Sequence, residues 1–293
     1  MRAVKEMANA KINLYLDVIS RREDGFHDVK TVMHSVSLAD ELTVTYTPAA
    51  QASVRMSVKG NRFLPTDDKN LAARAAMLFM QNAGINATVE IKLEKRIPVA
   101  AGLAGGSSDA AATLRAMNKL FDRIFTDRAL SLMAARLGSD VPYCLYGKTA
   151  LCEGRGEIMT KLPDTLKLNV VVATAHEHVA TPAAYASLDT MYSSFDGSVP
   201  TGAKPYYDSL ISAIRSGESI SGGLFNVFES AVLPACPGAK TLKSRLIELG
   251  AVASMMSGSG PSVFGIFDTE DEAQAAAKRL SEEGFFAASA KSV

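Results

Sequence analysis

The chain has 293 residues, 47% of them apolar and 21% charged, which is enough for two globular domains. Lys plus Arg and Asp plus Glu both number 31, so the formal net charge is zero, which argues against a nucleic-acid partner. The sequence shows no signal-peptide pattern and no run of eighteen apolar residues. Its three cysteines lack C-x-x-C spacing and are expected to be thiols. We therefore expect a cytoplasmic protein with no membrane partner.

Hydrophobic periodicity predicts the elements of the first half. Alternation over residues 11–18 predicts a strand that places Lys11 and Asn13 side by side on its polar face. Two further alternating runs, 41–47 and 53–58, predict a hairpin that turns near Pro48. The remaining predicted elements are a helix over 71–82 that stops at Gly84, a strand over 87–94, and helices over 108–120 and 127–137.

The second half carries a similar mixture of signals. A continuous apolar run over 168–174 predicts a buried strand, and the stretch 191–205 predicts an irregular, mobile loop. Thr269 and Glu272 form a capping box that begins a helix. The other predicted elements are a helix over 239–249, strands over 251–257 and 262–267, and a last strand over 286–293. We predict an α/β sandwich with an antiparallel sheet, and two domains, 1–161 and 162–293.

The most informative stretch is a loop of small residues and glycines that runs into a predicted helix. Its residues are Pro98, Val99, Ala100, Ala101, Gly102, Leu103, Ala104, Gly105, Gly106, Ser107 and Ser108. Ser107 or Ser108 is expected to cap the helix, whose positive end would then face an anion, most often phosphate. The loop lacks the lysine of a Walker A motif and the spacing of a dinucleotide fingerprint. A glycine-rich turn that merely precedes a buried helix remains the alternative.

Two charged residues have the chemistry that phosphoryl transfer requires. A carboxylate such as Asp140 can accept the proton of an acceptor hydroxyl, and an ammonium such as Lys11 can steady the attacking oxygen. Asp140 follows a predicted helix and precedes Pro142, so a role as a turn or cap residue is open as well. The sequence itself does not show that the two residues meet.

The motifs resemble those of a known family. The glycine loop is similar to the ATP-binding motif of the GHMP kinase superfamily. The chain further resembles the 4-diphosphocytidyl-2-C-methyl-D-erythritol kinases within it, in motif order and over nearly its whole length. The motifs that carry this closer resemblance are Ala10-Lys-Ile-Asn-Leu-Tyr-Leu16, Arg22-Glu-Asp-Gly-Phe-His27, Leu137-Gly-Ser-Asp-Val-Pro142, Asn226-Val-Phe-Glu229 and Met256-Ser-Gly-Ser-Gly-Pro-Ser-Val-Phe264.

This resemblance implies a fold, an activity and roles for individual residues. The fold would be of the α+β class, with an N-terminal α/β domain, a C-terminal ferredoxin-like sandwich and an active site in the cleft. The enzyme would phosphorylate the 2-hydroxyl of 4-diphosphocytidyl-2-C-methyl-D-erythritol with ATP, in the non-mevalonate (methylerythritol phosphate) route to isoprenoid and terpenoid precursors. Mg²⁺ would bridge the phosphates, with its protein ligands unknown, and the enzyme would be a monomer or homodimer.

By position, the resemblance makes Asp140 the general base and Lys11 its partner. The acceptor substrate would be held by Asn13, Phe26, His27, Thr181 and Tyr185, with the cytosine stacked by Phe26 and Tyr185 and hydrogen bonded by His27. Asn70, Leu71 and Lys95 would line the adenine pocket, and the glycine loop would wrap the triphosphate. The rival predictions are a homoserine or mevalonate kinase, which would have no need of Phe26 and His27, and a nonenzymatic binding protein of the same fold.

Overall fold

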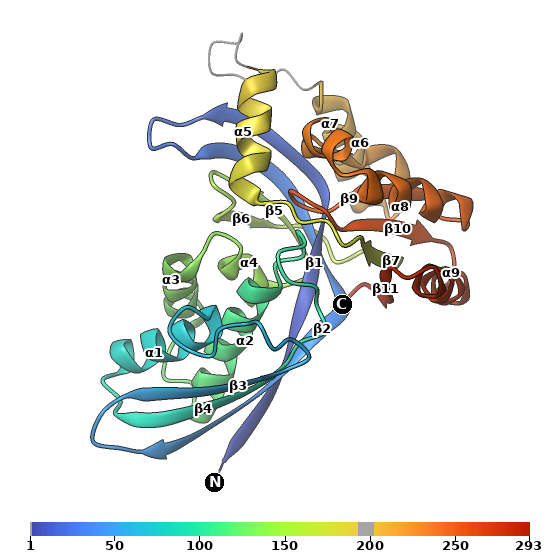
Figure 1. Ribbon diagram of the computed structural model, residues 1–293. Coiled ribbons are helices and arrows are strands. Elements are labelled where there is room, and N and C mark those ends of the chain that lie inside the picture. The colour runs from blue at the N-terminus through green and yellow to red at the C-terminus, as the bar shows by residue number, and fades with distance from the viewer. Residues whose placement is uncertain (1, 193–201) are drawn as a thin grey trace. The chain divides into compact units, whose positions relative to one another are not determined.

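The computed structural model describes residues 2–192 and 202–293, and the chain packs into two compact units (Figure 1). Unit 1 consists of the described residues of segments 1–10, 39–99 and 104–147. Unit 2 consists of those of segments 11–38, 100–103 and 148–293. Two long strands, β1 (Ala3–Arg21) and β2 (His27–Pro48), contribute residues to both units. The expected domain boundary between residues 161 and 162 remains a prediction.

The strands of unit 1 pair differently from the predicted hairpin. Strand β4 (Ala87–Glu94) is antiparallel to the end of β2 and parallel to β3 (Ser53–Lys59), so it lies between the two strands that we expected to be partners. The hairpin prediction was therefore wrong. The alternation of apolar residues correctly identified each strand. Which strands pair depends instead on residues distant in sequence, because β4 lies between β2 and β3 and buries Val89, Ile91 and Leu93.

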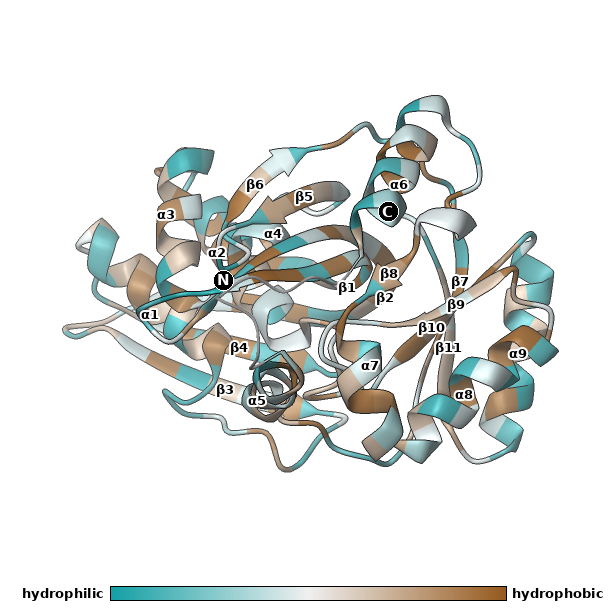
Figure 2. Cartoon of the chain, turned by 90° about the horizontal axis from the view of Figure 1, so that it is seen from above, coloured by the Kyte–Doolittle hydropathy of each residue, from teal (hydrophilic) through white to brown (hydrophobic). Residues whose placement is uncertain are grey.

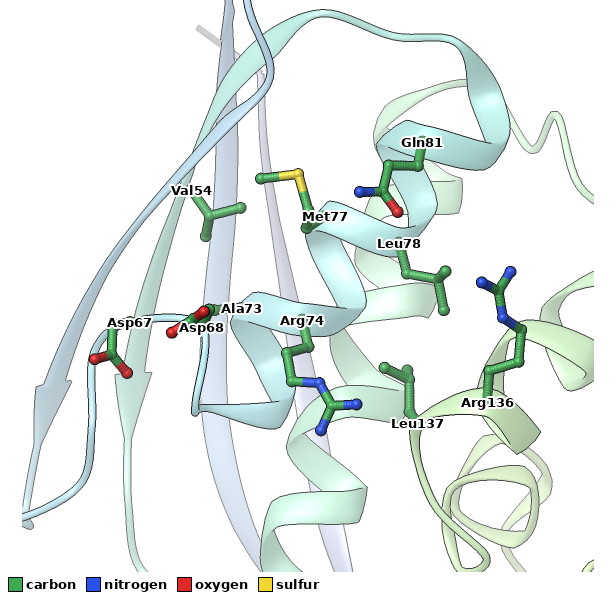
Figure 3. A pocket seen from close by; sticks show the side chains of 10 residues that line it. All are labelled: Val54, Asp67, Asp68, Ala73, Arg74, Met77, Leu78, Gln81, Arg136 and Leu137. Atoms are coloured by element: carbon green, nitrogen blue, oxygen red, sulfur yellow. The ribbon is translucent and has the colours of Figure 1, made fainter.

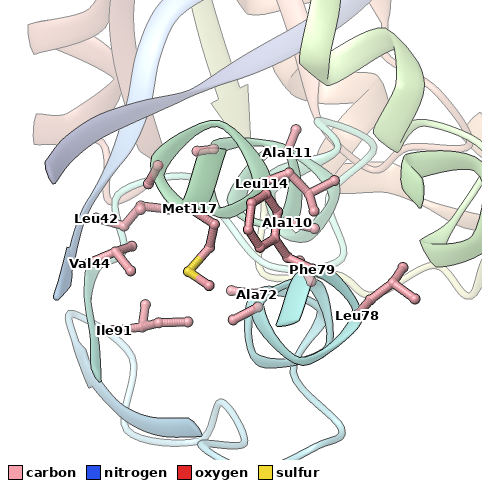
Figure 4. Close-up of a cluster of buried hydrophobic side chains, with 14 of the residues drawn as sticks. Leu42, Val44, Ala72, Leu78, Phe79, Ile91, Ala110, Ala111, Leu114 and Met117 are labelled. Carbon is pink, nitrogen blue, oxygen red and sulfur yellow. The ribbon is translucent and has the colours of Figure 1, made fainter. Parts of the chain in front are cut away.

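Unit 1 also contains the helices α1 (Leu71–Ala83), α2 (Gly105–Leu120), α3 (Asp127–Leu137) and α4 (Val141–Tyr146). Helix α1 packs against β3 and β4, α2 and α3 pack against α1, and α4 packs against α2 and α3. Phe79 of α1 and Leu114 and Met117 of α2 meet in a fully buried core (Figure 4). Helix α1 ends at Gly84, which adopts φ 64° and donates its N–H to a carbonyl of the last turn, as the sequence predicted. This core anchors α2, whose first turn is the end of the glycine loop.

Helix α2 begins earlier than expected and without a serine cap. Its N-cap is Ala104, in the left-handed region at φ 57°, and Gly105 is its first residue. Ser107 and Ser108 therefore lie inside the first turn, so the prediction that one of them caps the helix was wrong. The physical reason is the loop itself. A Cβ at Gly105 would lie 3.1 Å from Ile97 Cγ2, so glycine allows the first turn of the helix to pack this closely.

Unit 2 continues β1 and β2 with short additional strands. Strand β5 (Thr149–Glu153) is antiparallel to β2 and to β6 (Ile158–Lys161), while β8 (Phe225–Asn226) is parallel to β1 opposite Tyr15 and Leu16. These pairings place Asn226 directly beside the strand that carries Lys11 and Asn13. None of these three short strands was predicted, because two to five residues show too little periodicity.

A second sheet in unit 2 has the order β11–β7–β10–β9 and is antiparallel throughout. Its strands are β11 (Phe286–Lys291), β7 (Asn169–Thr174), β10 (Val263–Phe267) and β9 (Ala253–Met256). With α8 (Pro237–Glu248) after β7 and α9 (Glu270–Glu282) after β10, the chain order is β-α-β-β-α-β, as in ferredoxin-like folds. Both helices mix hydrophilic and hydrophobic residues around their surfaces, as amphipathic helices do (Figure 2). Thr269 and Glu272 form the predicted capping box.

The described residues of unit 2 also form the helices α5 (Thr181–Met191), α6 (Lys204–Ser216) and α7 (Phe228–Val232). The short turns η1 (Ser221–Gly223) and η2 (Leu233–Ala235) flank α7 and β8. Of the predicted loop 191–205, residues 193–201 lie outside the described part of the chain, and α6 already begins at Lys204.

Cys144, Cys152 and Cys236 are thiols. Across residues 2–192 and 202–293, the helices are too short or too polar to cross a membrane.

Candidate active site

Lys11 is the centre of a buried polar network in unit 2. Its side chain is 4% exposed, and its Nζ donates to Asn13 Oδ1 at 2.6 Å and to the carbonyl oxygen of Gly102 at 2.9 Å. Asn13 Nδ2 in turn donates to Thr31 Oγ1 at 2.8 Å. The alternation of β1 places Lys11 and Asn13 on one face, as predicted. The lysine therefore ties the strand to the glycine loop.

A tight turn over residues 257–260 closes on this network. Ser257 Oγ donates to the same Gly102 carbonyl at 3.0 Å, and Gly258 lies so close that a Cβ there would be 3.3 Å from Lys11 Nζ. Asn226 Nδ2 donates to the carbonyl of Gly258 at 2.8 Å and fixes the turn. This turn belongs to the motif Met256–Phe264 of the family resemblance, and a larger residue at Gly258 would push the glycine loop away from Lys11.

The glycine loop has an unusual backbone. Ala100, Gly102 and Ala104 all have positive φ, at 53°, 77° and 57°. Two of these are alanines, for which the left-handed region is costly, so the surrounding contacts must hold the loop in place. After Ala104 the chain enters α2, whose first N–H groups have no partner within the helix. Such an arrangement of turns and a helix start is suited to an anion.

The predicted adenine-side residues meet the first turn of α2 within unit 1. A Cβ at Gly105 would be 3.2 Å from Lys95 Nζ, and one at Gly106 would be 3.7 Å from Leu71 Cδ1. Asn70 caps α1: its Oδ1 accepts from Ala72 N at 3.0 Å, while its Nδ2 donates to the carbonyl of Pro65 at 2.9 Å. Both the oxygen and the nitrogen of the Asn70 amide thus stabilise the start of α1, a role that the sequence analysis did not predict.

Lys95 belongs to a buried charge cluster that the sequence did not reveal. Its Nζ donates to Asp40 Oδ2 and, at 2.8 Å, to Asp109 Oδ2. Asp40 Oδ1 also accepts from the backbone N–H of Ile97 at 2.9 Å. Burial raises the pKa of the Asp109 carboxyl to about 7, against the attraction of the Lys95 ammonium. This cluster joins the end of β4 to the first turns of α2.

Asp140 is the N-cap residue of α4. In the part of the chain that the structure describes, its carboxylate accepts no capping hydrogen bond from that helix. A side chain that is not needed for the cap is compatible with a chemical task. The structure places Asp140 in unit 1 and Lys11 in unit 2, so their joint role remains a prediction.

The predicted acceptor-side residues gather around α5. Thr181 Oγ1 lies 2.9 Å from Ser259 Oγ, which connects the start of the helix to the turn beside Lys11. One helical turn later, the Tyr185 ring stacks on the His27 imidazole, with 4.6 Å between centroids. Phe26 is 54% exposed, and the Arg155 guanidinium lies 5.0 Å from its ring centroid. An aromatic face next to a cation can stack a base.

A separate pocket of about 340 Å³ lies beside α1 (Figure 3). Its lining includes the apolar side chains of Met77, Leu78 and Leu137 and the guanidinium groups of Arg74 and Arg136. None of the candidate catalytic or binding residues predicted from the sequence lines this pocket.

Comparison with known proteins agrees with this geometry. The model of the GHMP kinases N terminal domain matches residues 70–148, and that of the GHMP kinases C terminal domain matches residues 209–285. The 4-diphosphocytidyl-2-C-methyl-D-erythritol kinase of Lachnospira eligens is 40% identical over 97% of this chain and 96% of its own length. The Gloeobacter violaceus kinase of the same name is 42% identical over 97% of this chain and 92% of its own length. The chain belongs to the 4-diphosphocytidyl-2-C-methyl-D-erythritol kinase family.

Solved structures agree with membership of this kinase family. A crystal structure titled as 4-(cytidine 5'-diphospho)-2C-methyl-D-erythritol kinase aligns with a TM-score of 0.79 and 33% identity, over 98% of both chains. A homoserine kinase from Cytophaga hutchinsonii aligns with a TM-score of 0.76 at 21% identity, over 100% of this chain and 95% of its own, which shows the shared fold alone. The predicted fold class, the family and the assignment as an ATP-dependent small-molecule kinase are thereby confirmed.

Proposed function

We propose that this chain transfers the γ-phosphoryl group of ATP to the 2-hydroxyl of 4-diphosphocytidyl-2-C-methyl-D-erythritol, a step in the synthesis of isoprenoid precursors. Relatives that carry this activity in their names match the chain nearly from end to end. One structural observation supports the proposal most directly. Lys11 Nζ is hydrogen bonded to the Gly102 carbonyl, so the candidate catalytic lysine is built into the candidate phosphate loop.

The proposed reaction assigns one task to each side chain. The Asp140 carboxylate accepts the proton of the acceptor hydroxyl, whose oxygen attacks the γ-phosphorus. The bond from that phosphorus to the bridging oxygen of ADP breaks, and ADP leaves. The Lys11 ammonium stabilises the negative charge that develops on the attacking oxygen. Asn13, which accepts a hydrogen bond from Lys11, holds the ammonium in position.

ATP is proposed to bind at the glycine loop, with its phosphates against the backbone N–H groups at the start of α2. Within residues 2–192 and 202–293, His, Cys, Asp and Glu side chains form no group of three or more that could hold a metal ion. These residues do not fit a resident metal centre, so no step of the proposed mechanism passes through one. Mg²⁺ is proposed to arrive as part of the MgATP substrate, with most of its water ligands retained.

The acceptor is proposed to bind through its cytosine, between Phe26, His27 and Tyr185, with Thr181 nearby. We also propose a cytoplasmic location, which accords with the three thiols. The oligomeric state, monomer or homodimer, stays a prediction.

The test is ADP release by the purified protein with MgATP and three separate acceptors. We expect turnover with 4-diphosphocytidyl-2-C-methyl-D-erythritol and none with homoserine or mevalonate. Asp140→Asn should fold normally, because its carboxylate makes no cap bond in the described structure, and should lose at least about 100-fold in kcat. Turnover with homoserine or mevalonate would contradict the acceptor assignment, and an Asp140→Asn enzyme as active as the parent would contradict the assignment of the base.

A further inference from the structure

The imidazole of His27 is held by two side chains of helix α5. Asp189 Oδ1 lies 2.7 Å from His27 Nε2, and the Tyr185 ring stacks on the imidazole at an interplanar angle of 25°. The His27 side chain is only 8% exposed. These contacts fix both the position of the ring and the direction in which each of its nitrogens points.

Helix α5 is arranged to make these contacts. Thr181, Tyr185 and Asp189 are spaced four residues apart, so they lie on one face of the helix. Tyr185 is itself supported by the edge-on ring of Phe228 at 4.8 Å. The other oxygen of Asp189 lies 3.8 Å from Arg21 Nη1.

We propose that Asp189 is a positioning residue that makes His27 a hydrogen-bond acceptor and thereby selects cytosine over uracil. This inference rests on the proposed function, because it takes the cytosine of the acceptor to lie against His27. Neither residue type nor motif drew attention to Asp189 in the sequence. Its role follows from its contact with His27 Nε2.

The chemical argument starts from the carboxylate. An ionised Asp189 can only accept a hydrogen bond, so the Nε2 atom of His27 must carry the proton. In the neutral ring, Nδ1 is then left with a lone pair. Among the described residues no partner is found for Nδ1, so this lone pair is available to a ligand.

Cytosine and uracil differ at the atoms that such a lone pair would meet. Cytosine carries an exocyclic amino group, which donates, where uracil carries a carbonyl oxygen, which accepts. An acceptor nitrogen attracts the former and repels the latter. A site that leaves a buried polar group unpaired with the wrong ligand discriminates more strongly than one that only loses a contact.

Asp189→Asn tests this role with little change in shape. The amide can offer either its oxygen or its NH₂ group to Nε2, so the variant no longer excludes the tautomer in which Nδ1 carries the proton and donates to uracil. The measurement is kcat/KM for the cytidine substrate and for its uridine analogue. We expect the parent to favour the cytidine substrate, and Asp189→Asn to lower that ratio about tenfold.

Two further variants make the result specific. Asp189→Glu keeps the carboxylate and should retain most of the preference. Ser187→Ala is the matched control on the same helix and should leave the ratio unchanged. Within the described part of the chain, Ser187 Oγ donates only to the Ala183 carbonyl of its own helix. The ratio compares two substrates of one sample, so partial loss of folded protein does not alter it.

The outcomes separate this inference from the proposed function. If the parent turns over neither nucleotide substrate, the proposed function fails. If the parent favours the cytidine substrate and Asp189→Asn lowers kcat/KM equally for both, Asp189 has only a structural role and the inference is overturned. A ¹⁵N NMR spectrum of the ligand-free parent at about pH 8 gives an independent reading: we expect the Nε2–H tautomer of His27, and the Nδ1–H tautomer would also overturn the inference.

Discussion

Gly102→Ala should disrupt both the fold of the glycine loop and catalysis. Gly102 has φ 77°, and a Cβ on it would lie 2.1 Å from the carbonyl oxygen of Ser257. That oxygen cannot retreat easily, since Ser257 is fully buried and its backbone N–H donates to Ser262 O at 2.9 Å. The loop must therefore shift, and with it the Gly102 carbonyl that accepts from Lys11 and Ser257.

The expected loss of folding free energy in Gly102→Ala has two contributions. An alanine in the left-handed region costs about 1–2 kcal/mol. Loss of the hydrogen bond from the charged Lys11 Nζ adds about 1.5–3 kcal/mol. At about 2–4 °C per kcal/mol for a chain of this size, the melting midpoint should fall by on the order of 10 °C. Because Lys11 loses its anchor, kcat should also fall at least about tenfold.

Gly84→Ala is the matched control. Gly84 also has a positive φ, 64°, but nothing lies within 4 Å of a Cβ there. This variant is therefore destabilised by the unfavourable backbone conformation of alanine but not by a steric clash. We expect its melting midpoint to fall by only about 3 °C and its kcat to match the parent. The assays are thermal unfolding followed by circular dichroism and ADP release. Equal midpoints for Gly102→Ala and Gly84→Ala, with parental kcat in both, would refute the close approach of the loop to Ser257.

Three further predictions follow from single residues. Burial lowers the pKa of His34 to about 4, so the unfolded chain binds the extra proton between about pH 4 and 6.5, and this group's contribution to stability rises with pH across that window. The free energy of unfolding in urea should rise with pH more steeply in the parent than in His34→Gln, by at most about 1.4 kcal/mol per pH unit in this window. Equal slopes in the two proteins would contradict a neutral His34. For Asp109, whose pKa is raised to about 7, the folded state holds the proton, so its contribution falls as pH rises from about 4 to 7. The difference in unfolding free energy between the parent and Asp109→Asn should therefore fall as pH rises, opposite to the trend for His34. A difference independent of pH would show that Asp109 is ionised throughout this range. Phe26→Ala should raise KM for the cytidine substrate with little change in KM for ATP, because the exposed ring is proposed to stack only on the acceptor. Steady-state kinetics that show equal loss for both substrates would exclude the stacking role.

Local signals predicted individual elements well. Gly84 stops α1, and the Thr269–Glu272 capping box starts α9, because both depend on backbone and side-chain geometry within one turn. Local signals failed where the structure depends on distant residues. The alternating run at 53–58 is a strand, but it pairs with β4 rather than with its neighbour in sequence, since pairing is decided by what the sheet buries.

The motifs likewise marked segments that the structure brings together. Lys11 and the glycine loop were singled out by their residue types, and the turn at Gly258 lies in a motif of the family resemblance. That Lys11 Nζ bonds to Gly102 and that Gly258 leaves room for it are tertiary facts, because these residues are far apart along the chain.

The sequence by itself determined the family, the candidate phosphate loop and most of the secondary structure, because each is encoded by residue types at short spacing. Only the tertiary structure decided which charges are neighbours. Asp40, Lys95 and Asp109 form a buried cluster, and Asp189 meets His27, although no motif connects them. The physical reason is that periodicity records which face of an element is buried, whereas the partner of a polar side chain depends on where the folded chain brings a second element.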